Sequence, residues 1–512
     1  MTTYVNGLKE TTTKDLSKFY KLERTIHDLS SKPVLGIGIG AIFLSIIWLA
    51  THTLTAGVEN QAFIIAAGVI GGYMALNIGA NDVANNVGPA FGAKSLTMAG
   101  ALIIAAIFET AGAVLAGGDV VKTISKGIID PSLIPNTKVF MMLMMSALLS
   151  AAMWINLATF FGAPVSTTHS IVGGVLGSGI AAAGATVVNW GVMTKIAASW
   201  VISPVLGGIV AAMFLAFIKN RVLYQKDTIA AAKHWVPILV SLMAGVFAAY
   251  LSVKGLKRVW TPEPWMVVVI GAGFFAATYA VVKPLIAKRS QGMANTKKAI
   301  RGLFHIPLIC AAALLSFAHG ANDVANAVGP LAAIVNAAST GAVTANVGIP
   351  AWVLFVGAAG ITMGLMLFGP KLIRTVGVKI TRMNPMRAYC VALSAAITVI
   401  VASAFGLPVS STHIAVGAVF GIGFLREYHS SKGTHMGGYA KKAPGLLSPR
   451  PPSKWDLLPA EEKTRRKKLV RRQYLWSIIA AWLITVPLSA LFAGGIYIAL
   501  NEFVILEFIT TS

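Results

Sequence analysis

The feature that most constrains the fold is a series of eleven long apolar stretches. About 20 apolar residues in a helix cross the roughly 30 Å hydrocarbon core of a bilayer. Two shorter apolar pieces, 170–184 and 414–425, are too short to span and predict re-entrant helical hairpins or broken helices. The sequence predicts an all-α polytopic membrane protein with about 12 transmembrane elements. The long stretches lie near 34–55, 61–80, 96–118, 138–160, 190–218, 234–252, 265–283, 303–319, 350–369, 389–405 and 475–500.

Composition supports this class. Hydrophobic residues make up 56% of the chain and charged residues only 12%, which is outside the range of soluble globular proteins. The net charge of +24 would suggest nucleic acid for a soluble protein. Here the basic residues lie mostly in loops, where the positive-inside rule accounts for them, so no nucleic-acid partner is expected. Cys310 and Cys390 both lie in apolar segments, which gives no support for a disulfide framework.

An acidic motif occurs twice. Residues 79–89 read Gly-Ala-Asn-Asp-Val-Ala-Asn-Asn-Val-Gly-Pro, and residues 320–330 match them at ten of eleven positions, 241 residues later. A hydroxyl-rich motif is also repeated: residues 161–169 read Phe-Gly-Ala-Pro-Val-Ser-Thr-Thr-His, and residues 405–413 read Phe-Gly-Leu-Pro-Val-Ser-Ser-Thr-His, offset by 244. The chain therefore consists of two related halves, each with one motif of each kind.

This duplication predicts a domain organisation. The predicted parts are an N-terminal tail at 1–33, an extra transmembrane helix at 34–56, a first transport repeat at 61–218, a linker with two transmembrane helices at 219–302, a second repeat at 303–426, a basic cytoplasmic loop at 427–474, and the last helix of the second repeat at 475–500.

The loops also predict how the repeats are oriented. The loop after 350–369 carries five basic residues and no acid, whereas the corresponding loop of the first repeat contains Asp119 and Asp130 among its lysines. Opposite membrane faces would explain the difference. Internal repeats can also be parallel, which is the alternative arrangement. Inverted repeats commonly place the substrate near the bilayer midplane, at the interface between the halves.

Asp82 and Asp323 are the most informative residues, because a carboxylate at membrane depth is costly unless it has a partner or faces water. Carboxylate and amide oxygens together form a hard ligand set suited to Na⁺ or a proton. The flanking Gly and Gly-Pro residues predict a helix break that frees backbone carbonyls. A polar contact between helices is the structural alternative. The predicted cation-binding residues are Asn81, Asp82, Asn85, Asn322, Asp323 and Asn326.

The hydroxyl-rich motifs predict the opposite chemistry. Ser and Thr after a proline are good N-cap residues, so a half-helix is expected to begin at each motif. Free N–H groups and the positive end of the helix dipole form an anion site there. Ordinary capping of buried helix ends is the alternative. The predicted substrate-binding residues are Ser166, Thr167, Thr168, Ser410, Ser411 and Thr412, together with Asp82 and Asp323.

Three further residues are candidates for a proton relay. His169 and His413 end the hydroxyl-rich motifs and could donate to an anion or carry a proton, although a hydrogen-bonded structural histidine is equally consistent. Glu109 lies within a span where the second half has Ile361. Its lack of a twin argues against a core role in a symmetric site and leaves a coupling role open. No catalytic residue, cofactor or structural metal is predicted.

Two aspartates beside a bound dianion would be strongly destabilised unless cations enter with it, so the motifs predict obligatory co-transport. Hydrogen phosphate has an O–H that can donate to a carboxylate, whereas sulfate has none, which favours phosphate as a hypothesis.

At these paired motifs the sequence resembles the inorganic phosphate transporter (Pit) family, over about 61–426 and the last span. The resemblance implies secondary active import of inorganic phosphate across a bacterial inner membrane, coupled to Na⁺ or H⁺, with inverted repeats and a homodimer in the lipid bilayer. Some members look like carriers of a neutral complex of phosphate with a divalent metal. Ala327 and Ser411 stand where the first copy has Asn86 and Thr167, so the two half-sites are unequal.

Three other functions fit parts of the sequence. A sulfate symporter of the same family would use the same motifs. An intramembrane aspartyl protease would use Asp82 and Asp323 as a catalytic dyad but leaves the hydroxyl-rich motifs without a role. A passive anion channel would never accumulate phosphate beyond electrochemical equilibrium.

Overall fold

The computed structural model describes residues 33–161, 165–255, 260–343, 348–374, 376, 383–431 and 472–511. The predicted tail at 1–33 and most of the predicted loop at 427–474 lie outside these residues. The described elements are α2 (Pro33–Leu54), α3 (Gln61–Asn81), α4 (Val83–Gly92), α5 (Met98–Ala116), α6 (Gly118–Lys126), η1 (Pro131–Leu133), α7 (Thr137–Phe160), α8 (Thr167–Ala183), η2 (Ala185–Val187), α9 (Trp190–Ile218), η3 (Lys219–Leu223), α10 (Thr228–Lys254), α11 (Pro264–Arg289), α12 (Lys297–Arg301), η4 (Gly302–Phe304), α13 (His305–Thr340), α14 (Ala351–Arg374), α15 (Pro385–Ala404), α16 (Ser411–Ser431) and α18 (Arg472–Thr511).

The prediction of an all-α polytopic membrane protein is confirmed. Eleven of the described helices are long and apolar enough to cross a membrane, and each corresponds to one of the eleven apolar stretches. A helix satisfies its own backbone hydrogen bonds, which is why apolar stretches of this length adopt it in hydrocarbon. Side chains cap several of them. Asn136 accepts from the Val139 N–H at the start of α7, and Asn384 does the same for Arg387 in α15.

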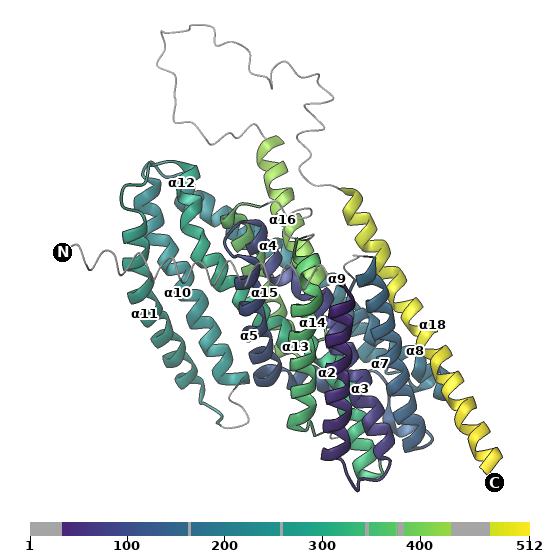
Figure 1. Cartoon of the computed structure of the whole chain (residues 1–512). Helices are drawn as coiled ribbons and strands as arrows, with labels where there is room; N and C mark the ends of the chain where they lie inside the picture. Colours follow the sequence, from purple (N-terminus) through teal and green to yellow (C-terminus); the bar gives the residue numbers. More distant parts are fainter. Residues whose placement is uncertain are drawn as a thin grey trace, which may run out of the picture.

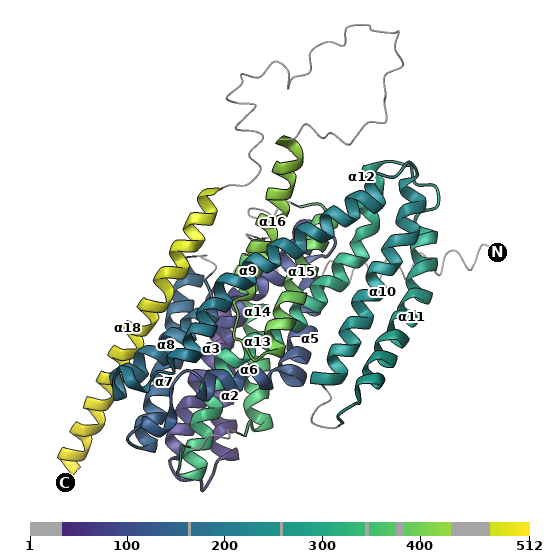
Figure 2. The same ribbon diagram turned by 180° about the vertical axis from the view of Figure 1, so that it is seen from behind.

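The helices form an elongated bundle around α13 (Figure 1). Nearly all of α13 is buried, and it packs against α3, α5, α6, α7, α14 and α15. The pair α10 and α11 lies on one side of the bundle and α18 on the opposite side, in both views (Figures 1 and 2). Only Val282 and Ile286 of α11 are buried among its described residues, so its outer surface is available to lipid.

The repeats are interleaved. Helix α3 of the first repeat packs on α14 of the second, and α13 of the second packs on α5 of the first. A Cβ on Gly79 would overlap the main chain of Ile361, and a Cβ on Gly320 would overlap that of Glu109. These glycines are needed because the backbones approach so closely. The two contacts use equivalent positions of the two repeats.

The later helices of the two repeats also pack across the repeats. Helix α8 of the first repeat packs on α18 of the second, and α16 of the second packs on α9 of the first. Equivalent residues also meet directly at two points. The Thr110 and Thr362 hydroxyls are 3.0 Å apart, and the ring centroids of His169 and His413 are 4.6 Å apart. These pairs lie where a two-fold relation between the repeats would bring each residue against its own counterpart. Inversion of the repeats across the membrane stays a prediction.

The predicted helix break at the acidic motifs is wrong in the second copy and small in the first. Helix α13 runs through Asp323 and Pro330 without interruption. Between α3 and α4, Asp82 keeps helical angles (φ −85°, ψ −34°), and its N–H still donates to the Ile78 carbonyl at 2.9 Å. A proline removes only one donor, so the carbonyls of Asn85 and Asn326, four residues before Pro89 and Pro330, lose their usual partner, and packing on every side holds the rest of each helix together. The interruptions lie instead between α7 and α8 and between α15 and α16.

Candidate functional site

The hydroxyl-rich motifs place two helix N-termini at the centre of the bundle. Helix α8 begins at Thr167, and its N-cap Ser166 accepts from the His169 N–H at 3.1 Å. Helix α16 begins at Ser411, and Ser410 accepts from the His413 N–H at 3.3 Å. The two starts are in contact, since the Thr168 hydroxyl donates to the Val409 carbonyl at 3.1 Å. The remaining N–H groups of each first turn have no partner within their own helix, and the dipole of each helix is positive at this end.

The acidic motifs lie beside these helix starts. Thr167 donates to Asp82 at 2.6 Å, and the equivalent Ser411 donates to Asp323 at 3.2 Å. Asp82 also accepts from Thr412 of the other repeat at 3.1 Å. Both carboxylates are almost completely buried, with exposed fractions of 2% for Asp82 and 1% for Asp323. Each aspartate is therefore held by hydroxyl donors that come from the motif predicted to bind the anion.

The asparagines join the two repeats. Asn85 donates to Thr412 at 2.8 Å, and the equivalent Asn326 donates to Thr167 and Thr168 at 3.1 and 3.2 Å. Each amide thus contacts hydroxyls of the opposite repeat. The structure brings these predicted residues into one hydrogen-bonded network.

The earlier asparagine of each motif fixes the chain that leads into each helix start. Asn81 accepts from the Val165 N–H and Asn322 from the Val409 N–H, both at 3.3 Å. Their amide groups donate at 2.8 Å to equivalent hydroxyls of the preceding helices, which belong to Thr159 and Ser403. These bonds give Asn81 and Asn322 a positioning role that the sequence interpretation had not separated from cation binding.

Three buried oxygens in the site have no hydrogen-bond donor among the described residues: Asn86 Oδ1, Asp323 Oδ1 and Asn326 Oδ1. Asp323 and Asn326 lie one turn apart on the same face of α13. Leaving a buried acceptor without a donor costs about 1–3 kcal/mol. A cation would supply the missing partner, and carboxylate and amide oxygens are suitable ligands for Na⁺.

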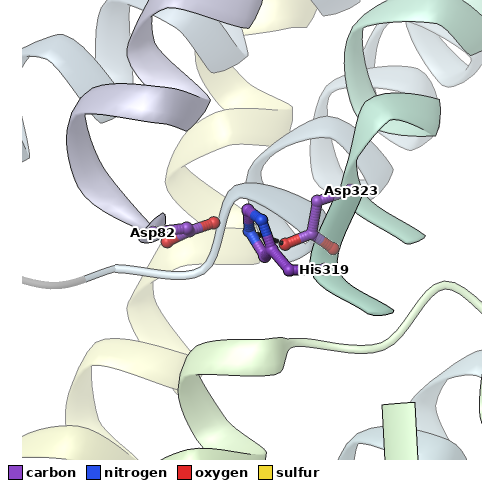
Figure 3. Close-up of side chains that lie close together, drawn as sticks. All are labelled: Asp82, His319 and Asp323. Atoms are coloured by element: carbon purple, nitrogen blue, oxygen red, sulfur yellow. Dashed lines mark ion pairs between the residues drawn. The ribbon is translucent and has the colours of Figure 1, made fainter. Parts of the chain in front are cut away.

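The site also contains a histidine that reading the sequence missed. The Nε2 atom of His319 is 2.7 Å from Asp323 Oδ2, and its Nδ1 atom is 2.6 Å from Glu109 Oε2. The other oxygen of Glu109 accepts from Asn86 at 2.7 Å. Figure 3 shows the His319 ring between the carboxylates of Asp82 and Asp323. The spacing offered a signal, because His319 precedes Asp323 by one helical turn.

Glu109 is therefore part of the network even though it has no twin. Its two partners also lack polar counterparts: His319 corresponds to Ile78, and Asn86 corresponds to Ala327. Glu109 itself corresponds to Ile361, so each of the three polar residues has an apolar residue at the equivalent position of the opposite repeat. The absence of a twin had argued against a core role in a symmetric site, but the structure contains an asymmetric polar chain inside an otherwise paired arrangement.

His169 and His413 pack on each other. Their rings are in contact, and the edge of Trp200 packs on His169 with ring centroids 3.8 Å apart. Trp200 itself donates to the Pro408 carbonyl at 3.1 Å. Among the described residues, neither ring nitrogen of His169 has a hydrogen-bond partner. A proton relay through His169 thus has no hydrogen-bonded connection to Asp82 or Asp323 in this structure, whereas Glu109 is connected to Asp323 through His319.

Comparisons with known proteins agree with this architecture. The model of the phosphate transporter family matches residues 78–493. The chain belongs to the phosphate transporter family. A Helicobacter pylori (strain J99) protein named "Putative phosphate permease" is 43% identical over 531 residues, covering 95% of this chain and 98% of its own length. A Pyrococcus furiosus protein with the same description is 36% identical and covers 84% of this chain and 95% of its own length.

A solved structure is also similar. It is described as "The sodium-dependent phosphate transporter", is 35% identical in sequence, and matches with a TM-score of 0.75 over 86% of this chain and 99% of its own. The family and this structure are transporters, which agrees with a protein that is not an enzyme. The chain is thus a multi-pass membrane protein of a family that transports phosphate.

Proposed function

We propose that the protein is a secondary active symporter that imports inorganic phosphate across a bacterial inner membrane together with Na⁺. The observation that carries this proposal is that the hydroxyls at both helix starts donate to Asp82 and Asp323. Phosphate needs those same hydroxyls as donors. Association as a homodimer stays a prediction.

The shared donors suggest a mechanism for coupling. A cation bound to Asp82 or Asp323 takes over the carboxylate oxygens, and this frees the hydroxyls of Thr167, Ser411 and Thr412 to turn toward the anion. The cation also offsets the repulsion between the carboxylates and a dianion, which is strong in a buried site. Phosphate and cation therefore bind better together than separately, as symport requires. The similar solved structure is that of a transporter described as sodium-dependent, which supports Na⁺ as this cation.

Binding measurements test this coupling. We expect Na⁺ to raise the affinity of the purified protein for labelled phosphate, and phosphate to raise its affinity for Na⁺ by the same factor, because linkage is reciprocal. Asp82→Asn should remove the effect of Na⁺ on phosphate binding. Asp130→Asn, which changes an exposed loop carboxylate, is the matched control and should behave as wild type. Phosphate affinity that does not depend on Na⁺ in the wild type would refute the mechanism.

A second cargo is favoured by one specific arrangement. Ligand atoms of Asp82, His319 and Asp323 lie within 4.8 Å of one another and could hold a metal ion. Imidazole suits divalent transition metals better than Na⁺. A histidine that ligates a metal usually donates its other N–H to a carboxylate, which is the position of Glu109 beside His319 Nδ1. We propose that a complex of phosphate with a divalent metal is also carried, with the metal in place of the proton on His319 Nε2.

The two cargoes can be separated with one variant. In protein that is folded and inserted, His319→Gln should lose phosphate uptake that depends on Mn²⁺ and keep uptake that depends on Na⁺, since Asp82 and its hydroxyl donors are unchanged. Equal loss of both would show that His319 is needed for the site as a whole and would refute a separate metal cargo.

A further inference from the structure

Four basic side chains gather where four helix ends meet, away from the aspartates. Lys219 caps the C-terminal end of α9, Arg301 ends α12, Arg387 lies in the first turn of α15, and Arg426 lies near the end of α16. We call these four residues the basic cluster. Figure 2 shows the upper end of α9 running toward α12, at the end of the bundle where α16 also rises. The basic linkers of the sequence predict this end to be cytoplasmic.

The four side chains repel one another. Arg387 is repelled by the charges of Arg426 and Arg301. Lys219 is repelled by those of Arg387 and Arg426. Arg301 also acts on Arg426. All four residues are half-buried, so water screens these repulsions less than it would on an open surface. Gathering like charges in this way costs free energy unless an anion joins them.

The cluster also lacks partners of its own. The Nε atoms of Arg301 and Arg387 are buried without a hydrogen-bond acceptor. Across the described ranges, none of the four side chains forms an ion pair. By contrast, Lys254, the last residue of α10, pairs with Asp119 at 2.6 Å. Buried charged donors without an acceptor cost more than neutral ones. Two unpartnered guanidinium groups facing like charges thus indicate an anion that completes the site.

The chemistry of the cluster specifies the anion. Guanidinium groups bind phosphate oxygens through two parallel N–H donors, and Arg is favoured over Lys wherever such recognition is needed. Basic pockets between transmembrane helices on the cytoplasmic side bind lipid headgroups. We propose that the basic cluster is a second phosphate-group site, separate from the one at Asp82 and Asp323. Its ligand is either the headgroup of an anionic phospholipid or free inorganic phosphate.

Two arms of one experiment distinguish these sources. In the first, purified and delipidated protein is unfolded by heat in mixed micelles that contain either phosphatidylglycerol or phosphatidylcholine. In the second, binding of labelled inorganic phosphate is measured at equilibrium. Both arms compare wild type with Arg387→Gln/Arg426→Gln and with the control Arg289→Gln, which removes an exposed arginine from the end of α11. The transport site is unchanged in all three proteins, so phosphate bound there contributes equally to each measurement.

Each outcome has a defined meaning. If phosphatidylglycerol raises the unfolding temperature of wild type and control but not of the double variant, the site binds a lipid headgroup. If the double variant instead loses one equivalent of bound phosphate, the site binds free phosphate. If it matches wild type in both arms, the proposal is wrong. Removing like charges should not prevent folding. If it does, the variant Arg387→Lys/Arg426→Lys replaces the double Gln variant, because it keeps the charge and loses only the planar donors. It should bind the same ligand about tenfold more weakly than wild type.

Discussion

The buried contact between Glu109 and His319 can be tested by a double-mutant cycle. The Nδ1 atom of His319 is 2.6 Å from the Glu109 carboxylate, and neither side chain has any exposed surface. Changing His319 to Gln leaves the buried Glu109 carboxylate without its cationic partner, which costs about 3–5 kcal/mol. Changing Glu109 to Gln should cost less, because His319 keeps its contact with Asp323. Changing both removes the two charges together, so we expect the double variant to lose less stability than the sum of the single variants.

The expected coupling is about 1.5–3 kcal/mol, the contribution of a hydrogen bond to a charged group. The assay is the free energy of unfolding of the purified protein in detergent micelles. Ile78 and Ile361 occupy the equivalent positions of the other repeat and provide the matched control, with Ile78→Val and Ile361→Val. If Glu109→Gln and His319→Gln are additive within about 0.5 kcal/mol, the two residues do not interact as described.

Three more predictions follow from individual contacts. Thr412→Val keeps the shape of the side chain but removes the donor to Asp82. It should raise the KM for phosphate uptake about tenfold, as the loss of one hydrogen bond to a charged group implies. An effect on protein abundance alone would show that Thr412 only stabilises the start of α16. Gly320→Ala places a Cβ on the main chain of Glu109 and should abolish folded protein in the membrane, whereas Gly273→Ala, where the space is open, should not; equal yields would contradict the close packing. Lys254→Met breaks an ion pair with Asp119 that is partly exposed, and it should cost no more than about 1 kcal/mol in unfolding experiments; a loss of several kcal/mol would show that the pair is more important than its exposure suggests.

The sequence predicted the transmembrane helices well because their signal is local. A stretch of about 20 apolar residues has few structural alternatives in a membrane. The starts of α8 and α16 were predictable for the same reason, since Ser166 and Ser410 cap the helix that immediately follows them. The break at Asp82 and Asp323 was overestimated, because packing across the whole length of α13 holds the helix together despite Pro330.

Most of the predicted site residues belong to the duplicated motifs, and Glu109 is the one candidate without a counterpart that the structure also places in the network. Asp82 and Thr167 stand out because each has a counterpart, and the structure brings them within 2.6 Å. His319 and Asn86 have apolar counterparts, so a search for repeated residues misses them. Their contacts with Glu109 join separate helices, and for His319 the two residues lie more than 200 positions apart in the chain, so no local pattern encodes them. The spacing of His319 and Asp323 within α13 was the only local signal for His319.

The most direct test of the proposed mechanism is uptake of labelled phosphate into proteoliposomes. An inward Na⁺ gradient is imposed at equal pH on the two sides, and in parallel an inward proton gradient is imposed without Na⁺. The mechanism predicts accumulation beyond electrochemical equilibrium with the Na⁺ gradient, and its loss in Asp82→Asn and in Asp323→Asn that are folded and inserted. Accumulation with the proton gradient alone, or normal accumulation by either variant, would contradict it.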